Sequence, residues 1–567
     1  MPKQPIDAIK TFVTAEDLIE RRLTLDEFNA AISSASRAAL LKALAGILAR
    51  IETTSTFNQD VQRDVANQYF QGAGLNRALT AIDAGRILLA PQTLLVAMKT
   101  VLVLAPEDGP NDVSAGALFT VLLFLADVVG GAEGKPEDRW RGFPREVSLE
   151  VIRNQNFNRS EVMSVTMARY WRLWHELPLE LGAGNPPEEF AEEAGCRPEE
   201  LMLFGLWCWV SAQRGLIHLP SQWLADIPLP DKAKAACVAI MSAPIGELRE
   251  RAGKESVEDG IPWAFLAFRQ SPLTTLSDGS LVILSPRYVA ERAFGGAMYW
   301  TLNDRANRID GEEVRNGPAW QAFRNRHASC VEKYAEEVLA GWLPAEDDRR
   351  RAYFEEDMEV AWGEGTPVSD VALDYDWAWA CLEINSRRFS QGAAMGAGPE
   401  EMDRELRLMV EDKAGRQLHS TVNKLRSAAR ELTQRDSRAR RFFPVMLLAY
   451  GFPANPLTIE TIREKLRGSG QLQGEDVAQL ELIDLQELDM LDAVREQTGE
   501  TFVRVLRDKQ DSAFFRSSIS DYLYLEKQLD IPASARLDAL FRESFGAALA
   551  ASNDPSLIEG LEQRRGR

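Results

Sequence analysis

The sequence predicts a multi-domain α+β protein that is mostly helical, and three observations lead to this class. The chain has 567 residues, enough for two to four domains with substantial cores. Apolar residues recur at helical spacing through most of the first half, whereas two later stretches alternate with the period of strands. We expect an all-helical N-terminal domain at 1–245, a small α+β connecting segment at 246–315, an α/β core at 316–500, and C-terminal helices with a tail at 501–567.

The N-terminal region carries clear helix signals. Thr24 and Glu27 have the spacing of a capping box, in which the side chain of each residue bonds the backbone N–H of the other at a helix start. The most apolar run covers residues 115–129 and is shorter than the roughly 20 residues that a membrane-spanning helix needs. We therefore expect a buried helix there, and no membrane partner.

Short apolar runs mark the connecting segment. Residues 263–268 and 281–284 are predicted to be strands, with a polar turn before the second. Ser285 and Pro286 then open a helix, because serine caps a helix start and proline is tolerated at its first position.

The core is predicted to contain both helices and strands. We expect helices at 316–343, at 400–432 and from Leu485 onward, and strands at 443–449 and 480–484.

Composition excludes several classes of protein. A formal net charge of −20 argues against a protein that coats nucleic acid with its whole surface, since phosphate would repel it. The five cysteines are odd in number and widely spaced, which favours reduced, buried thiols. Four histidines without CxxC or HExxH spacing give no support for zinc chemistry. The N-terminus lacks the apolar segment of a secretory signal, so a cytoplasmic protein is expected.

The stretch from residue 365 to 389 is predicted to be a β-hairpin. Val371, Leu373 and Tyr375 fall on one face of its first strand, and alternation continues along a second strand after a turn at Asp376 and Trp377. This turn lacks the glycine that tight hairpin turns prefer.

A two-residue turn also sets the pairing of the strands. It places Asp370 opposite Glu383 at the mouth of the hairpin, where Asn385 shares the face of Glu383. Two carboxylates brought together in apolar surroundings repel each other. A divalent cation between them removes this cost, and Mg²⁺ is commonly held by one or two carboxylates together with substrate phosphates.

These residues resemble a known family. Asp370, a spacer and then Glu383-Ile384-Asn385 resemble the motif of the PD-(D/E)xK, or restriction-endonuclease-like, nucleases. One position departs from the family pattern, because Asn385 stands where the family has a lysine.

Flanking segments extend the resemblance to roughly residues 318–500. Residues 330–334 resemble the first core helix, which places Glu332 at its acidic position. Residues 413–418 resemble the helix after the motif strand, and residues 443–448 resemble the next core strand. The resemblance implies an α/β restriction-endonuclease-like core.

The resemblance also implies the chemistry. Asp370 and Glu383 match the ligands of Mg²⁺ or Mn²⁺, with the backbone carbonyl of Ile384 as a further ligand. The metal orients a water for attack on phosphorus. Asn385 can hydrogen-bond water or phosphate but cannot act as a base, so Lys413 is a candidate replacement for the missing lysine. The expected catalytic set is Asp370, Glu383, Asn385, Lys413, Gln417 and Glu332.

Basic residues follow the motif in an otherwise acidic chain. Such a helix face can track a phosphate backbone, or it can simply offset the acidic surface elsewhere. The expected nucleic-acid contacts are Arg387, Arg388, Arg416, Lys424, Arg426 and Arg430.

Each site residue also has a structural interpretation. Asp370 can cap a strand, Glu383 can pair with Arg387 or Arg388, and Glu332 can be an exposed helix residue.

Three functions follow from the sequence. The first is a metal-dependent nuclease acting on DNA or RNA, with DNA favoured, as an effector of prokaryotic defence against phage. The second is an inactive relative that uses the fold as a scaffold binding nucleic acid or protein. The third is a helical adaptor, with a protein partner or a second copy of itself.

Overall fold

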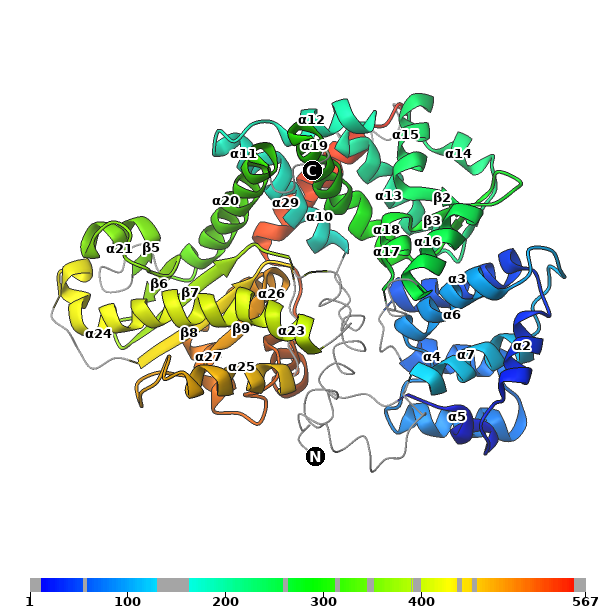
Figure 1. The fold of residues 1–567 in the computed structure, drawn as a ribbon, viewed down its shortest axis with the longest axis horizontal. Helices are drawn as coiled ribbons and strands as arrows, with labels where there is room; N and C mark the ends of the chain where they lie inside the picture. Colours follow the sequence, from blue (N-terminus) through cyan, green and yellow to red (C-terminus); the bar gives the residue numbers. More distant parts are fainter. Residues whose placement is uncertain are drawn as a thin grey trace.

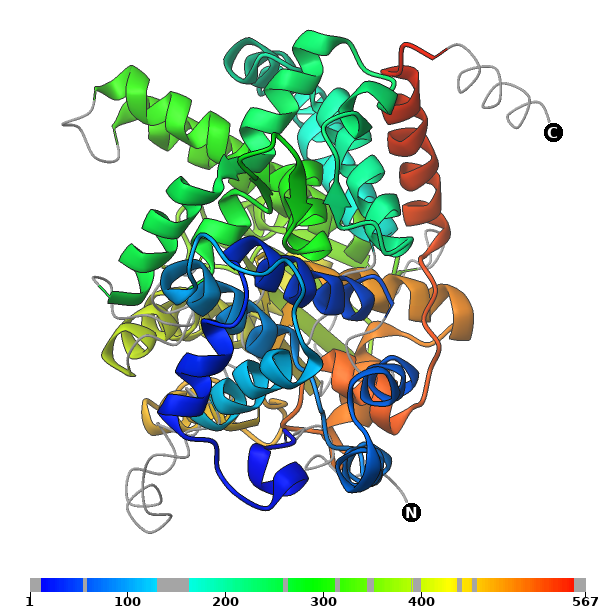
Figure 2. The ribbon, with the colours of Figure 1, turned by 90° about the vertical axis from the view of Figure 1, so that its right-hand side faces the viewer.

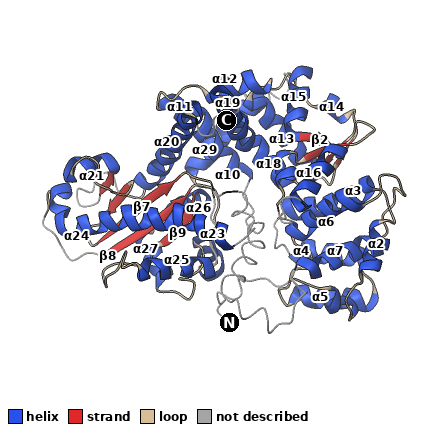
Figure 3. Cartoon of the chain, in the orientation of Figure 1, coloured by secondary structure: helices blue, strands red, loops and turns tan. Residues whose placement is uncertain are grey.

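The computed structural model describes residues 12–54, 59–129, 163–257, 264–311, 317–343, 351–388, 390, 399–435, 441–450 and 456–554. Helices dominate this part of the chain, and its strands form two small mixed sheets (Figure 3). The mostly helical α+β class predicted from the sequence is therefore confirmed.

The N-terminal helices form a bundle of their own (Figure 1). Thr24 caps α2 with the predicted capping box, its hydroxyl accepting from Glu27 N and its own N–H donating to the Glu27 carboxylate. Helix α7 packs its apolar residues against α2 and α6, as expected of a buried helix. The bundle consists of α1 (Ala15–Ile19), α2 (Leu25–Ile32), α3 (Arg37–Glu52), α4 (Gln59–Tyr69), α5 (Gly72–Asp83), α6 (Pro91–Leu104) and α7 (Ala115–Val129).

Among the described residues, no single helix has both the length and the apolar character needed to cross a membrane. The sharply bent pair formed by α2 and α3 passes the same test of length and composition when the two helices are taken together.

A second helical layer lies along the top of the view in Figure 1 and contacts both the bundle and the larger sheet. The five cysteines of the chain are free and buried, as predicted. The helices of this layer are α10 (Met163–Trp171), the π-helical segment η3 (Arg172–Glu176), α11 (Leu177–Glu180), α12 (Pro186–Ala194), α13 (Pro198–Gln213), α14 (Trp223–Asp226), α15 (Asp231–Met241), α16 (Ile245–Val257), α17 (Leu266–Gln270), α18 (Pro286–Glu291), π-helical η4 (Arg292–Gly296), α19 (Ala297–Asp310) and α20 (Pro318–Ala340).

The smaller sheet has the strand order β1-β4-β3-β2 and draws on both sides of residue 245. Its strands are β1 (His218–Leu219), β2 (Ser242–Pro244), β3 (Leu273–Thr275) and β4 (Leu281–Ile283). The expectation of an N-terminal region without strands is therefore wrong for β1 and β2, which are too short to show a period in the sequence.

The connecting segment is corrected at one point and confirmed at two. Residues 266–270 form helix α17 instead of the predicted strand, and Trp263 lies outside the described residues. Short apolar runs fit a buried helix as well as a strand, which explains the error. The strand near 281–284 is present as β4, and the Ser285 hydroxyl caps α18 by accepting from Tyr288 N at 3.2 Å.

The larger sheet follows α20 and has the order β5-β6-β7-β8-β9. Its first three strands are antiparallel to one another, whereas β8 and β9 run parallel to β7. The strands are β5 (Arg351–Phe354), β6 (Val371–Asp374), β7 (Ala378–Asn385), β8 (Arg441–Leu448) and β9 (Glu481–Asp484). The predicted hairpin and both predicted strands after it are therefore present.

Two separate cores cover the two faces of this sheet. Alternate residues of β6, β7 and β8 join the main core, with α20, α26 and α27 on that side. The other residues of these strands join a second core under a long helical run and two further helices. These elements are α21 (Glu355–Trp362), α23 (Pro399–Leu406), π-helical η5 (Arg407–Glu411) and η6 (Ala414–Leu418), α24 (His419–Thr433) and α25 (Pro456–Gly468).

The last helix, α29, returns to the second helical layer. Helix α29 packs against α10 and α13, so the C-terminal end of the described chain lies beside the second helical layer (Figure 2). The elements that follow β9 are α26 (Leu485–Thr498), α27 (Phe502–Gln510), α28 (Ile519–Asp521), π-helical η7 (Tyr522–Glu526) and α29 (Ala535–Ala550). The predicted tail beyond residue 554 lies outside the described residues.

Candidate active site

The hairpin register places the two motif carboxylates opposite each other. Val371 pairs with Leu382 in the antiparallel ladder, so the next residues outward, Asp370 and Glu383, face each other as predicted. Their neighbours two positions away along the strands, Ala372 and Cys381, belong to the second core. Since side chains alternate along strands, both carboxylates are on that same face.

The turn of the hairpin explains this register. Tyr375 N donates to Ala378 O at 2.9 Å, which leaves Asp376 and Trp377 as the two loop residues. Asp376 has φ of +67°, the left-handed conformation in which a tight turn usually has glycine. The carboxylate of Asp374 accepts from Asp376 N at 2.8 Å and so supports this conformation.

Backbone contacts hold Asp370 in place. One carboxylate oxygen of Asp370 accepts from Ile384 N at 2.5 Å, which ties it to the strand that carries Glu383. The carbonyl of Asp370 accepts from Glu355 N at 3.0 Å, at the first turn of α21. Asp370 is thereby fixed between β7 and the start of a helix.

Glu383 is fully buried and only half satisfied. Its Oε1 lies 2.8 Å from the Nζ of Lys413, whose side chain is 42% exposed. Its Oε2 is buried and receives no hydrogen bond from any described residue. A buried carboxylate oxygen without a donor is costly, so this atom is a position for a cation, another donor or the carboxyl's own proton.

Lys413 reaches the site from the long helical run over the sheet. It lies between η5 and η6, two segments in which the backbone hydrogen bonds follow π-helical spacing. Such π turns are rare and are frequently found at functional sites. The candidate replacement for the family lysine therefore does contact the motif carboxylate, although Lys413 and Glu383 are far apart in sequence.

The site has a strongly acidic environment. Burial raises the pKa of Asp370 to about 7, and burial together with the Asp370 carboxylate raises the pKa of Glu383 to about 9. Burial and neighbouring acids also raise the pKa values of Glu332 and Glu355. Burial opposes the charged form of Lys413, but the carboxylates led by Glu383 raise the pKa of this lysine overall.

Glu355 belongs to the surroundings of the site and was not predicted. It lies at the start of α21, between the first two strands of the sheet, and acts electrostatically on both Asp370 and Glu383. The run Glu355-Glu356-Asp357 is typical of a first helical turn and was the one available signal. Glu332, which was predicted, lies on α20 and raises the pKa of Asp370.

The donor set bears on the expected metal. Among the described residues, no three His, Cys, Asp or Glu side chains come close enough to form a metal site by themselves. Asp370 and Glu383 nevertheless form a facing pair, and the buried Oε2 of Glu383 has no donor there. This pair fits the few protein ligands that Mg²⁺ needs when water and phosphate supply the others.

The remaining predicted catalytic residues lie close by in the chain but differ in their surroundings. Asn385 is 7% exposed, and its amide bonds the Met409 carbonyl and the Arg387 N–H. Gln417 lies in η6, half-buried, one turn beyond Lys413. The backbone N–H of Ile384 donates to Asp370.

Several of the predicted nucleic-acid contacts make contacts within the protein. Arg387 pairs with Glu405 at 3.3 Å, and Arg426 pairs with Asp476. Arg388 lies between two aromatic rings.

The rings that hold Arg388 are those of Tyr299 and Tyr450. Their centroids lie 3.7 and 3.9 Å from its guanidinium carbon. Through cation–π contacts of this kind, the guanidinium of Arg388 interacts with aromatic rings of the protein itself.

The other three predicted contacts lie on the helical run. Arg416 and Arg430 are exposed, on η6 and α24, and Lys424 is half-buried on α24.

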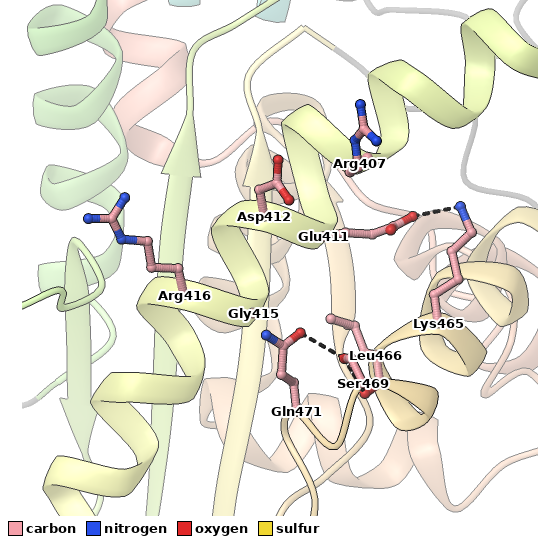
Figure 4. Close-up of a pocket in the computed structure, with 9 residues that line it drawn as sticks. All are labelled: Arg407, Glu411, Asp412, Gly415, Arg416, Lys465, Leu466, Ser469 and Gln471. Carbon is pink, nitrogen blue, oxygen red and sulfur yellow. Dashed lines mark hydrogen bonds and ion pairs between the residues drawn. The ribbon is translucent and has the colours of Figure 1, made fainter.

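A pocket of about 730 Å³ opens between this helical run and α25 (Figure 4). Lys465 bonds Glu411 at 2.8 Å across it, while Arg416 points away from these two side chains. The pocket lining is mixed in charge, and comprises Arg407, Glu411, Asp412, Gly415, Arg416, Lys465, Leu466, Ser469 and Gln471.

No protein-family model, no curated protein and no solved structure matches this chain.

Proposed function

We propose that the chain is a metal-dependent nuclease-like protein of the PD-(D/E)xK type that hydrolyses phosphodiester bonds of nucleic acid. One observation carries the proposal. Asp370 and Glu383 face each other across a hairpin, and Lys413 Nζ lies 2.8 Å from Glu383 Oε1. Two carboxylates and an ammonium at one point of a sheet are the groups that this chemistry requires.

The residues have distinct roles in this proposal. Asp370 and Glu383 hold Mg²⁺ or Mn²⁺, with the Ile384 carbonyl as a further ligand. When bound, the metal activates a water and offsets charge on the phosphate. Lys413 is partly exposed and positively charged, so it orients the water or the scissile phosphate from the solvent side of Glu383.

The order of the elements supports the same assignment. The long helix α20, the hairpin β6–β7, the helical run over one face and the parallel strand β8 come in this order in the chain, with β5 and α21 between α20 and the hairpin. This is the helix–hairpin–helix–strand order on which the sequence resemblance depends. The wider role that we propose is defence against foreign nucleic acid, with DNA as the first substrate to test.

One set of observations favours a second candidate, an inactive relative that binds nucleic acid or protein. Arg387, Arg388 and Arg426 contact groups within the protein, so they are less available to phosphates. In that case binding occurs without turnover.

Cleavage assays distinguish the two candidates. We expect the full chain to cut labelled single-stranded DNA, double-stranded DNA or RNA with Mn²⁺ or Mg²⁺, and not with EDTA. Asp370→Ala and Glu383→Ala should each reduce the rate at least about 1,000-fold, because they remove a metal ligand. Glu464→Ala, an exposed acid on α25, is the matched control and should cut normally.

Unchanged cutting by either site variant would refute the assignment. Metal-dependent cutting by the wild type would refute the inactive alternative. A crystal soaked in Mn²⁺ adds a direct test, with an anomalous peak expected between Asp370 and Glu383.

A further inference from the structure

Asn385 occupies the motif position that a lysine has in the resembled family, yet it is built into the fold. It is the last residue of β7 and is only 7% exposed. Buried amides usually have hydrogen-bond partners, so the partners of Asn385 indicate what the residue does.

The two ends of the amide bond different parts of the chain. Its oxygen accepts from Arg387 N at 2.9 Å, a local contact two residues on that shapes the exit from β7. Its Nδ2 donates to the carbonyl of Met409 at 2.9 Å, a contact between the sheet and the helical run above it. The second bond is the long-range one.

Met409 is placed to affect Lys413. It lies in η5, four residues before Lys413, so the two residues lie about one helical turn apart. Lys413 itself falls between two segments in which the backbone bonds have π-helical instead of α-helical spacing. A turn flanked by two such changes of spacing depends more on outside contacts for its position.

We infer that Asn385 is a positioning residue, which acts through its bond to Met409 to hold the turn that carries Lys413 against Glu383. The inference rests on the proposed function, because it gives Lys413 the role of the missing lysine. It also explains why the lysine is absent from position 385. A buried amide at the end of β7 anchors the helical run, and the ammonium comes from that run instead.

The test measures the position of Lys413 directly, without requiring cleavage. Lysines of the full chain are acetylated with a limiting amine-specific reagent, and the rate at each lysine is followed by mass spectrometry. Lys333 is the internal control, since its side chain is 45% exposed and bonded to Glu336 at 3.2 Å, against 42% and 2.8 Å for Lys413.

Asn385→Ser is the informative variant. A serine hydroxyl can still accept from Arg387 N but is too short to reach the Met409 carbonyl. Asn385→Leu, which keeps the approximate size and removes both bonds, is the second variant in case the first fails to fold. Glu383→Gln is the positive control, because it removes the charge that Lys413 contacts.

We expect acetylation of Lys413 to rise about threefold or more in both Asn385 variants and in Glu383→Gln, with Lys333 unchanged. A rise in Glu383→Gln without a rise in the folded Asn385 variants would overturn the inference. If the wild type cleaves nucleic acid, Asn385→Ser should lower kcat roughly 10- to 100-fold and leave KM within about twofold. Absence of cleavage would contradict the proposed function alone, since the labelling result does not depend on it.

Discussion

Two buried glutamates in the same sheet each pair with a lysine, but the two lysines differ in burial and in the number of carboxylate oxygens that they bond. Glu481 on β9 and Glu383 on β7 are exposed by 1% and 0%, and each has a lysine ammonium within 2.9 Å. Lys509, the partner of Glu481, is fully buried and bonds both carboxylate oxygens at 2.9 Å. Lys413, the partner of Glu383, is 42% exposed and bonds one.

The surroundings of the two pairs differ in the same direction. Glu481 has a second cation, Arg463, at 3.8 Å, so two cations lie close to this carboxylate. Glu383 has instead a second carboxylate, Asp370, and an oxygen without a donor among the described residues. In the first arrangement both carboxylate oxygens have a donor, and the pair stabilises the fold. The second leaves one carboxylate oxygen without a donor among the described residues, and buried acids with raised pKa values are frequent at functional sites.

The largest effect that tests this comparison is expected at the Glu481–Lys509 pair. Lys509→Met leaves Glu481 buried with Arg463 as its nearest cation, and should lower the free energy of unfolding by about 3–5 kcal/mol. Urea unfolding measures the change. Lys509→Met with Glu481→Gln should recover part of the loss; a single variant as stable as wild type would show that the pair is not structural.

The next largest effect is expected at Glu383, where a substitution should raise the free energy of unfolding instead of lowering it. Because the folded pKa values of Asp370 and Glu383 are raised, the protonated forms are favoured by folding. This stabilisation is complete below the ordinary carboxyl range, and it is lost as pH rises through about 7 for Asp370 and about 9 for Glu383.

Glu383→Gln removes the loss of stability that ionisation of Glu383 causes at higher pH, because glutamine carries no charge. In EDTA near pH 8 it should therefore raise the free energy of unfolding by roughly 1–3 kcal/mol, and have less effect near pH 5. Thermal or urea unfolding across this range measures the difference. Mn²⁺ should stabilise the wild type and not the variant. A variant less stable than wild type at every pH would place Glu383 with Glu481 as a structural residue.

A third prediction concerns position 385. Asn385→Lys restores the family motif by sequence, but the side chain is buried and Lys413 already contacts Glu383. We expect a loss of about 1–3 kcal/mol in stability from overpacking and the lost amide bonds, with no gain in cleavage. A rise in cleavage rate would mean that Lys413 does not replace the motif lysine.

The smallest effect on stability is expected at Lys413, the partner of Glu383. Near pH 7, Lys413→Met should change the free energy of unfolding by less than about 1 kcal/mol, because the raised pKa of Glu383 lets this buried carboxyl take up a proton when the ammonium is removed. Cleavage should nevertheless fall strongly in the same variant. A stability loss as large as that of Lys509→Met would remove the distinction between the two pairs.

Part of the candidate site could be predicted because it is local. The alternation of residues along β6 and β7, with two residues between the strands, determines that Asp370 faces Glu383. Glu332 on its helix and the strand β9 are equally visible as periodic patterns. The error at α17 and the missed β1, β2, β3, β5 and α21 arise from segments of two to eight residues, which show no decisive period.

The sequence by itself therefore determined the helical class, the hairpin and the facing carboxylates, since these depend on neighbours along the chain. The tertiary structure alone decided that Lys413 meets Glu383, that Asn385 bonds the Met409 carbonyl, and that Arg388 lies between two tyrosine rings. These contacts join residues tens of positions apart. Their geometry depends on how the helical run packs over the sheet, and that packing results from burial of the whole second core rather than from any local pattern.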